Sequence, residues 1–276
     1  MQYFDLRRLD ESNKEPGNHA RYHRDAASEP VARIEFSEDC RSVASPLPKP
    51  KQVDTMHRCA ALCVPEEINA CTGITIHGRL IKSFVFTTDV VTIHNCNADA
   101  VFAVYPLPCQ PTITRALLTA STTPVFTGVG GSVTHGQRSV DCAMESEILG
   151  VAGVVLNVSV DADTIRAVAQ HVGVIVVVTV VDFDERERER ILAGAQIVNV
   201  AAGEQTAQVV RKVRNSFPHI PIMATSGKTA SSIAATIEAG ADALCWTPPN
   251  MADLEHELMD SKRALASCKA NKSQSV

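Results

Sequence analysis

A regular alternation of short apolar runs with longer amphipathic segments occupies the chain from Phe84 onward, and it constrains the fold more than any other feature. The apolar runs are continuous rather than alternating in polarity, as expected for parallel strands that are buried on both faces. We predict eight such strands, at Phe84–Thr87, Ala100–Tyr105, Val125–Gly128, Gly153–Asn157, Val174–Val180, Ile197–Ala201, Ile222–Thr225 and Ala243–Trp246. The other segments predict eight helices, at Asp89–Cys96, Thr112–Ala120, Arg138–Leu149, Asp161–Val172, Glu185–Ala193, Thr206–Phe217, Ser231–Ala239 and Met251–Leu265.

The turns that lead into the strands repeat one pattern of small residues. Asn97-Ala98-Asp99, Ala193-Gly194-Ala195 and Ala239-Gly240-Ala241-Asp242 each precede a predicted strand, and small residues let a helix end reverse closely onto the next strand. Pro124 and Pro221 stand just before two other strands, where a fixed φ and a missing N–H do no harm. The pattern therefore indicates consecutive β/α units.

Eight β/α units favour a closed parallel barrel of the (β/α)8 or TIM type, which is a compact one because only about 195 residues are available. An open, doubly wound sheet is the alternative. It would need two edge strands, and none of the eight runs has the alternating polarity of an exposed edge. A closed barrel brings the loops after all eight strands to one rim, the mouth, where such folds bind their ligands.

The chain before the barrel divides into two parts. Residues 1–57 are rich in charge, Ser and Pro and show no apolar period. They cannot bury enough surface to offset their ordering entropy, so we expect a disordered or extended arm. Residues 58–83 are expected to form a linker and a hairpin, with Gly73–Ile76 and Leu80–Ile81 on either side of a turn at 77–79. The barrel is assigned to residues 84–268 and a flexible tail to 269–276.

Composition argues against several classes of partner. The formal net charge is −5 and only 4% of the residues are aromatic, which argues against a surface for nucleic acid or for an anionic membrane. The longest apolar stretch, Val172 to Val181, is too short to span a bilayer. The first residues have no apolar core of a signal peptide, so we expect a cytoplasmic location. The nine cysteines form no CxxC pair and are expected to be reduced thiols.

The loop after the seventh strand carries the clearest binding signal. Ser226, Gly227, Lys228 and Thr229 precede a predicted helix, so backbone N–H groups and a helix N-terminus meet there, as in many phosphate sites. The run resembles the end of a Walker A loop, but Ile222 stands where its first glycine belongs, which argues against a nucleoside triphosphatase. We predict an anion site in this loop, and the alternative is a glycine turn with Thr229 as helix N-cap.

A second glycine loop follows the third strand. It contains Gly130 and Gly131, and in a ring of eight the third and seventh strands lie opposite one another. Two anion cradles that face across the mouth would suit a ligand with two acidic ends, whereas close packing of the loop is the alternative. Asn157 ends the fourth strand and Asn199 lies near the end of the sixth, so both are predicted to reach the same ligand.

Two carboxylates and one histidine are the candidates for acid/base chemistry. Asp89 follows the first strand and Asp182 follows the fifth, and two such groups can divide the acid and base roles if their pKa values differ. Each has an alternative, because Asp89 can cap a helix and Asp182 can be a charged residue in a first helical turn. His135, in the second glycine loop, is the candidate general base. No His and carboxylate cluster has metal-ligand spacing, so no metal is assigned and any cofactor stays unknown.

The helix after the fifth strand begins with an alternating run of charges, Asp184-Glu-Arg-Glu-Arg-Glu-Arg190. Such a run is typical of a solvated helix face with ion pairs between successive turns. We therefore predict that these side chains face water.

A family resemblance follows from three stretches, Gly78-Arg-Leu-Ile-Lys-Ser-Phe-Val-Phe-Thr-Thr-Asp89, Val125-Phe-Thr-Gly-Val-Gly-Gly131 and Thr247-Pro-Pro249. They resemble small uncharacterised bacterial barrel proteins that carry only a generic hydrolase label. The glycine loop and the Ala-Gly-Ala turns are more distantly similar to the ribulose-phosphate-binding barrels, which include isomerases and an aldolase. The resemblance implies a compact phosphate-binding barrel of the hydrolase, lyase or isomerase kind. This chain has Ser226 where those relatives have the first of two glycines, so a serine Oγ would contact the phosphate.

Two functions fit these observations. The first is an enzyme that acts on a small phosphorylated or carboxylated metabolite at the mouth, by acid/base chemistry or hydrolysis. The second is a non-catalytic regulatory barrel that binds a phosphometabolite while the N-terminal arm contacts a partner. In both, the partner is a small anionic metabolite and neither nucleic acid nor a membrane, and the oligomeric state is open, with a homo-oligomer as one option.

Overall fold

Eight parallel strands close into a ring in the computed structural model, which describes residues 62–131, 133–225, 227, 229–256, 259, 260 and 263. In ring order they are β3 (Ser83–Phe86), β4 (Ala100–Ala103), β5 (Val125–Gly130), β6 (Gly153–Leu156), β7 (Ile175–Val180), β8 (Ile197–Val200), β9 (Ile222–Thr225) and β10 (Ala243–Trp246). Parallel pairing of β10 with β3 closes the ring. The predicted (β/α)8 barrel is therefore confirmed, and the open-sheet alternative is wrong.

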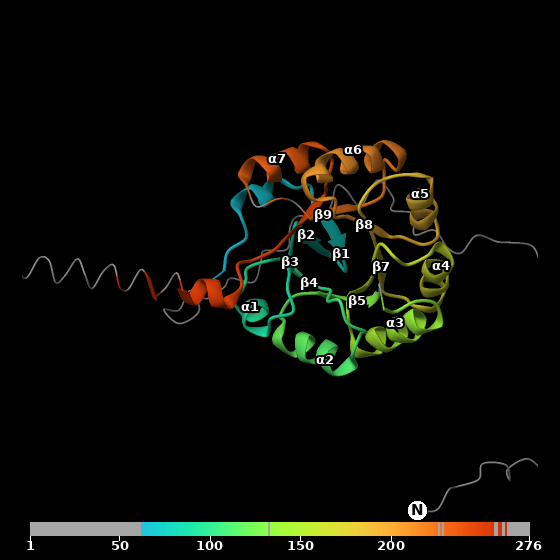
Figure 1. Ribbon diagram of the computed structural model, residues 1–276, viewed down its shortest axis with the longest axis horizontal. Coiled ribbons are helices and arrows are strands. Elements are labelled where there is room, and N and C mark those ends of the chain that lie inside the picture. The colour runs from blue at the N-terminus through green and yellow to red at the C-terminus, as the bar shows by residue number, and fades with distance from the viewer. Residues whose placement is uncertain are drawn as a thin grey trace, which may run out of the picture. The chain divides into compact units, whose positions relative to one another are not determined.

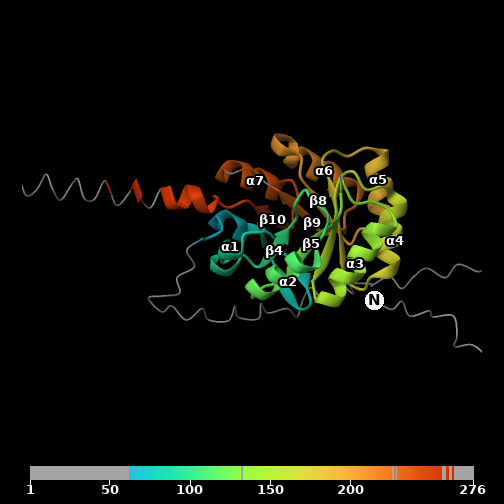
Figure 2. The same cartoon turned by 60° about the horizontal axis from the view of Figure 1, so that its bottom comes forward.

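A layer of helices surrounds the ring of strands, as Figures 1 and 2 show. Seven of them are α1 (Val90–Asn95), α2 (Pro111–Ala120), α3 (Gln137–Leu149), α4 (Ala162–His171), α5 (Glu185–Leu192), α6 (Thr206–Ser216) and α7 (Ala230–Glu238), and residues 251–256 are helical as well. Two 3-10 turns, η2 (Glu66–Ala70) and η3 (Gly203–Gln205), complete the elements. None of the described helices is long and apolar enough to cross a membrane.

An antiparallel hairpin covers the N-terminal end of the barrel. Its strands are β1 (Ile74–Ile76) and β2 (Arg79–Ile81), and the turn consists of His77 and Gly78, both with positive φ. A two-residue hairpin turn of this kind needs two left-handed residues, which is why Arg79 pairs with Ile76 in the ladder instead of forming part of the predicted turn. The hairpin isoleucines join the core inside the barrel. The hairpin fades with distance in Figure 1, so the mouth faces the viewer there.

The core has an inner and an outer layer because strand side chains alternate between the two faces of the sheet. The inner layer contains Phe84, Phe102 and Phe126, with Phe84 meeting the other two rings edge-on at 6.4 and 5.4 Å between centroids. The outer layer packs aliphatic side chains between the strands and the helices. Toward the mouth the inner face of β7 and β8 becomes polar, with Thr179 paired to Asn199.

The chain divides into two compact units between Ala44 and Ser45, and every described residue belongs to the second. The predicted arm, residues 1–57, and the predicted tail, residues 269–276, lie outside the described residues. These two assignments stay predictions.

Candidate functional site

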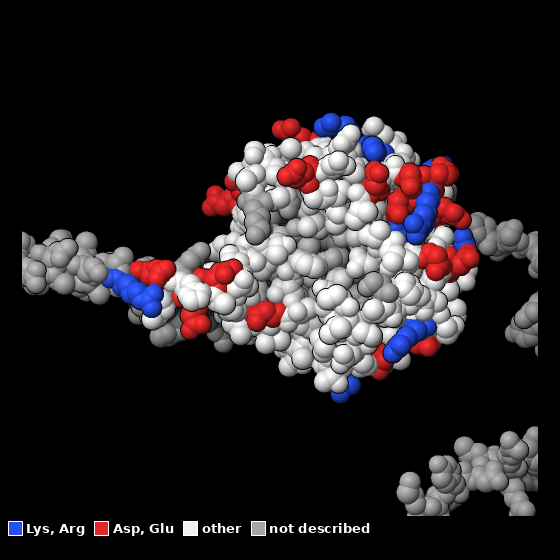
Figure 3. All heavy atoms as spheres, viewed as in Figure 1, with Lys and Arg blue, Asp and Glu red and all other residues white. Residues whose placement is uncertain are grey.

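A pocket of about 260 Å³ opens at the mouth, over the C-terminal ends of β3 to β6. Thirteen residues line it: Phe86, Val104, Tyr105, Pro106, Leu107, Cys109, Gly128, Val129, Gly130, Gly131, Val133, Thr134 and Asn157. No Asp, Glu, Lys, Arg or His is among these described lining residues. In Figure 3 the described side chains near the centre of this face are uncharged, and charged side chains stand around the rim.

The end of β5 is shaped by a register shift. Pairing with β6 slips between Gly128 and Gly130, so both Gly128 and Gly130 pair with successive residues of β6 and Val129 is the extra residue of a bulge. A Cβ on Gly130 would lie 2.7 Å from Leu156 Cδ2 and 3.0 Å from Ser139 Oγ. A larger residue here would have to displace the Leu156 side chain, so glycine allows this close approach to β6.

The second glycine loop is internally hydrogen-bonded. The N–H of Gly131 donates to the carbonyl of Thr134 at 3.0 Å, and the N–H of Thr134 donates back to Gly131 at 3.2 Å. Ser139 Oγ also donates to the Thr134 carbonyl, at 3.1 Å. Gly130 and Gly131, the two glycines predicted to bind a ligand, both line the pocket. The Gly131 N–H is already hydrogen-bonded within the loop, which fits the alternative of close packing.

Two lining residues with titratable side chains come from the segment after β4, and sequence reasoning did not select them. The Tyr105 hydroxyl accepts a hydrogen bond from the Gln110 N–H at 3.0 Å, and burial raises the pKa of this phenol. The Cys109 thiol lies 3.9 Å from Thr114 Oγ1 and 3.8 Å from Ser146 Oγ. The position of Tyr105 at the end of a predicted strand was the available signal.

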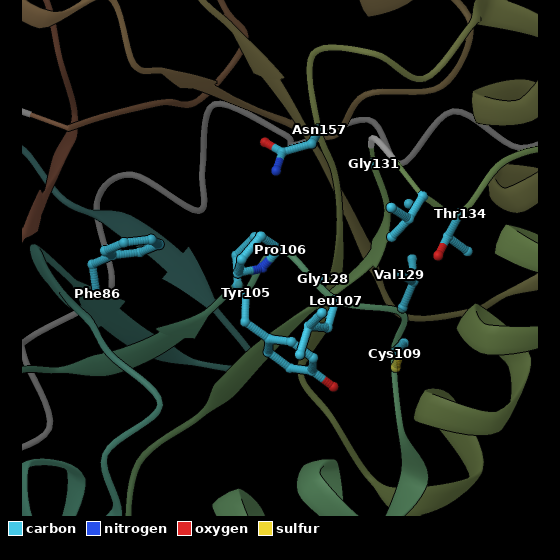
Figure 4. Close-up of a pocket in the computed structure, with 13 residues that line it drawn as sticks. Phe86, Tyr105, Pro106, Leu107, Cys109, Gly128, Val129, Gly131, Thr134 and Asn157 are labelled. Atoms are coloured by element: carbon cyan, nitrogen blue, oxygen red, sulfur yellow. The ribbon is translucent and has the colours of Figure 1, made fainter.

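A row of polar side chains runs from the pocket around the inner face of the barrel. Asn157 lines the pocket, and its side-chain amide hydrogen-bonds no described residue. Figure 4 shows this amide pointing into the space between Phe86 and Pro106. The register pairs Leu156 with Val178, so the next residue of each strand, Asn157 and Thr179, follow at the same level.

Asn199 continues this row. It pairs with inward-facing Met223, so it faces the barrel interior, and its Nδ2 donates to Thr179 Oγ1 at 3.1 Å. Its Oδ1 is buried and has no hydrogen-bond partner among the described residues. A flipped amide would exchange these roles and still leave one polar atom unpaired. The two predicted asparagines, Asn157 and Asn199, are therefore brought to one polar row with Thr179.

A buried arginine on α5 supports this row from outside the barrel. Arg190 donates from Nη2 to the Asn157 carbonyl at 2.7 Å, from Nε to the Val160 carbonyl at 2.7 Å and from Nη1 to the Thr179 carbonyl at 3.1 Å. It also pairs with Glu187, and the two side chains are only 1% and 8% exposed. The predicted solvated face of this helix is therefore wrong at these two residues, because both point toward the sheet.

The predicted acid/base residues lie outside the pocket lining. Asp89 is exposed and caps α1 by accepting the Thr92 N–H at 2.7 Å, which is the structural role given as its alternative. Asp182 is exposed, and the Phe183 N–H and Lys212 lower its pKa. His135 is exposed on the second glycine loop. No group of three or more His, Cys, Asp or Glu in the described part of the chain is placed to hold a metal ion.

The predicted anion loop is described in part. Ser226 and Lys228 lie outside the described residues, whereas Gly227 and Thr229 are exposed at the start of α7. The Gly227 N–H donates to Ser232 Oγ at 3.0 Å, and Thr229 Oγ1 accepts the Ser232 N–H at 3.3 Å, so Thr229 is the helix N-cap. A Cβ on Gly227 would lie 2.4 Å from Ser232 Oγ, so glycine is needed for this contact.

These features define a (β/α)8 barrel with an uncharged pocket at its mouth. No protein-family model matches the sequence, and no curated protein matches it. Solved structures do match it. One is a 2,3-dimethylmalate lyase of the PEP mutase/isocitrate lyase superfamily, which is 18% identical, with 68% of this chain and 82% of that chain covered and a TM-score of 0.50.

Two further solved structures are similar to this chain. A mandelate oxidase variant is 13% identical, with 64% of this chain and 69% of that chain covered and a TM-score of 0.50. A putative dihydrodipicolinate synthetase from Pseudomonas aeruginosa is 17% identical with a TM-score of 0.44, and the match covers 54% of this chain and 59% of that protein, less than two thirds of its length. At these identities the two matches with a TM-score of 0.50 establish the barrel fold and nothing about the reaction.

Proposed function

We propose that this chain is an enzyme that acts on a small phosphorylated or carboxylated metabolite at the mouth of the barrel. The observation that carries the proposal is the buried Asn199 amide, which has an unpaired polar atom among the described residues and lies in one polar row with pocket-lining Asn157. An unpaired buried polar atom costs about 1–3 kcal/mol of folding stability. A ligand that reaches into the barrel from the pocket would supply the missing partner.

The acidic end of the metabolite is assigned to the loop between β9 and α7. Gly227 and Thr229 stand at the N-terminal end of a nine-residue helix, where the helix dipole favours negative charge. Ser226 and Lys228 belong to the same proposed site on the strength of their sequence positions. The absence of carboxylates from the described pocket lining supports the proposal, since none of those residues would repel an anion.

The chemistry that we propose is proton transfer or hydrolysis. Asp89 is the proposed acid or base on the β3 side, because β3 also delivers Phe86 to the pocket. Asp182 and His135 are the proposed alternatives on other loops of the same rim. Tyr105 joins these candidates because it lines the pocket and burial raises its pKa, which keeps the phenol protonated as a hydrogen-bond donor.

A thermal-shift screen of phosphorylated sugars and carboxylic acids tests binding. A ligand at about a hundred times its dissociation constant should add about 2.7 kcal/mol of stability. Turnover of each hit is then compared among the parent protein, Asp89→Asn and Tyr105→Phe. The matched control is Asp141→Asn, at an exposed position on α3. Loss of turnover in either of the first two, with binding retained, supports the proposal, and a screen without any hit contradicts it.

The second candidate is a regulatory barrel that binds its metabolite without converting it. The specific observation in its favour is that Tyr105 and Cys109 are the only titratable side chains among the described lining residues. Binding in the screen together with no turnover of any hit by the parent protein would favour this function over the enzyme.

A further inference from the structure

One wall of the pocket is apolar and open to solvent. Phe86 ends β3, and Pro106 and Leu107 follow β4, so the wall comes from two neighbouring β/α connections. Figure 4 shows Phe86 and Pro106 on either side of the space into which the Asn157 amide points. Leu107 is 62% exposed, and Val133, in the loop after β5, is 52% exposed. A ligand that covers these side chains would remove their apolar surface from water.

The same pocket offers few hydrogen bonds. Of its thirteen lining residues, Tyr105, Thr134 and Asn157 have oxygen or nitrogen in their side chains, and Cys109 adds a thiol. The Tyr105 hydroxyl already accepts the Gln110 N–H, and the backbone of Thr134 is paired with Gly131. A sugar chain has several hydroxyl groups, each of which needs a partner when it leaves water. Three side chains with oxygen or nitrogen are few partners for several hydroxyl groups.

We infer that the metabolite carries a compact apolar group, branched or aromatic, rather than a polyhydroxylated chain. This group covers Phe86, Leu107 and Val133, while one hydroxyl, carbonyl or amine next to it meets the Asn157 amide. The inference rests on the proposed function, in which the loop after β9 binds the acidic end of the same molecule. It narrows the substrate class from sugar acids and sugar phosphates to acids with an apolar body.

Two pairs of probes with the same acidic group test the inference. Phenyllactate is compared with gluconate, and phenyl phosphate with ribose phosphate, by titration calorimetry on the full chain. The apolar member of each pair should bind about tenfold tighter, because its ring removes apolar surface from water in the pocket. The comparison within a pair keeps the acidic group constant, so it isolates the contribution of the body.

A matched substitution locates the effect. Leu107→Asn should weaken phenyllactate binding about fivefold and leave gluconate binding unchanged, because only the apolar body contacts this side chain. Val133→Asn repeats the test at a lining residue of the loop after β5. The control is Ile148→Asn on α3, where the side chain is 83% exposed and outside the pocket. All three positions are exposed, so the variants are expected to fold.

The outcomes separate the inference from the function on which it rests. Tighter binding of the apolar probes, with selective loss in Leu107→Asn, supports the inference. Equal or tighter binding of gluconate and ribose phosphate overturns it and leaves the proposed metabolite site standing. If no acid in either pair binds, and the wider screen has no hit, both the proposed function and the inference are contradicted.

Discussion

Arg190 supports Asn157 from behind: its Nη2 donates a 2.7 Å hydrogen bond to the Asn157 backbone carbonyl at the end of β6. The same guanidinium also reaches the carbonyls of Val160 and Thr179. These three carbonyls belong to the polar row and to the loop beside it, so one side chain on α5 links a helix outside the barrel to the pocket inside. Glu187 neutralises the buried charge. The Arg190–Glu187 ion pair therefore supports a pocket-lining residue without being part of the pocket lining itself.

Replacing Arg190 by Met should lower the free energy of unfolding by about 3–5 kcal/mol, because Glu187 is left as an unpaired buried charge. Urea unfolding measures the change. The control is Arg188→Met on the same helix, where the pair with Glu185 is exposed and the expected loss is about 0.3–0.5 kcal/mol. Similar losses in the two variants would show that the Arg190 network contributes little. Recovery of stability in the double variant Glu187→Leu, Arg190→Met would identify the unpaired carboxylate as the source of the cost.

The position of Arg190 explains where sequence reasoning failed on α5. A run of alternating acids and bases indicates a solvated face, since burying charges is costly. Helical spacing nevertheless places Glu187 and Arg190 on the same side as buried Ile191, four and one residues before it. Ile191 was therefore the sequence signal for the side of α5 that packs against the sheet. What the sequence does not show is that backbone carbonyls of two strands converge to accept the guanidinium.

The barrel itself could be predicted because each parallel strand must be buried on both faces, and continuous β-branched runs such as Ile175–Val180 are the direct result. The sequence also placed Asn157 and Asn199 near the C-terminal ends of their strands, where a closed barrel brings them to the mouth. The pocket wall could not be predicted in the same way, because Leu107 and Cys109 lie in an irregular segment without periodicity. For Asp89 the sequence already offered a helix-cap role as the alternative to catalysis. The hydrogen bond that Asp89 accepts from the Thr92 N–H is the bond expected of a helix cap.

The unpaired amide atom of Asn199 predicts that replacing this residue changes stability little or raises it, but weakens ligand binding. The double variant Asn199→Leu, Thr179→Val removes the hydrogen-bonded pair together with the unpaired atom, so stability should change little or rise by about 1 kcal/mol. Ligand binding should weaken at least tenfold if a ligand completes the amide. Thermal unfolding and calorimetry measure the two effects separately.

The control for this variant is Thr127→Val. Thr127 also has a buried hydroxyl without a partner among the described residues, and it pairs with Ala103 and Val154 of the outer layer, so its side chain faces the helices and not the barrel interior. Its replacement should leave binding unchanged. Unaltered binding in the Asn199 double variant would mean that the inner polar row does not reach the ligand.

The Gly227 N–H provides a test of the anion loop. Ser232 Oγ accepts this N–H at 3.0 Å and competes with any anion for it. Ser232→Ala should therefore raise the affinity for inorganic phosphate about two- to tenfold, the value of one hydrogen bond. In the control, Ser231→Ala, the lost hydroxyl is one that hydrogen-bonds the Thr229 hydroxyl and not the Gly227 N–H, and affinity should stay the same. A parent protein and Ser232→Ala variant with equal phosphate affinity would place the anion elsewhere.

The buried thiol of Cys245 predicts how stability depends on alkaline pH. Burial raises its pKa from 9.0 to about 12, although a hydrogen bond with Thr225 partly opposes the shift. Above about pH 9 the unfolded chain loses this proton while the folded chain keeps it, so the unfolded state is favoured as pH rises. The stability that this thiol contributes is complete below pH 9 and is lost between about pH 9 and 12, at about 1.4 kcal/mol per pH unit. Urea unfolding at several alkaline pH values measures the slope.

Two variants separate the thiol from its packing. Cys245→Ala removes both, so it should lower stability at neutral pH and make the alkaline slope shallower by about 1.4 kcal/mol per pH unit. Val177→Ala, in the same inner layer of the barrel, leaves a cavity without removing a thiol. It should lower stability by about 1 kcal/mol or more at every pH and keep the slope of the parent protein. If Cys245→Ala also keeps that slope, the barrel interior does not hold this thiol protonated, and the prediction is contradicted.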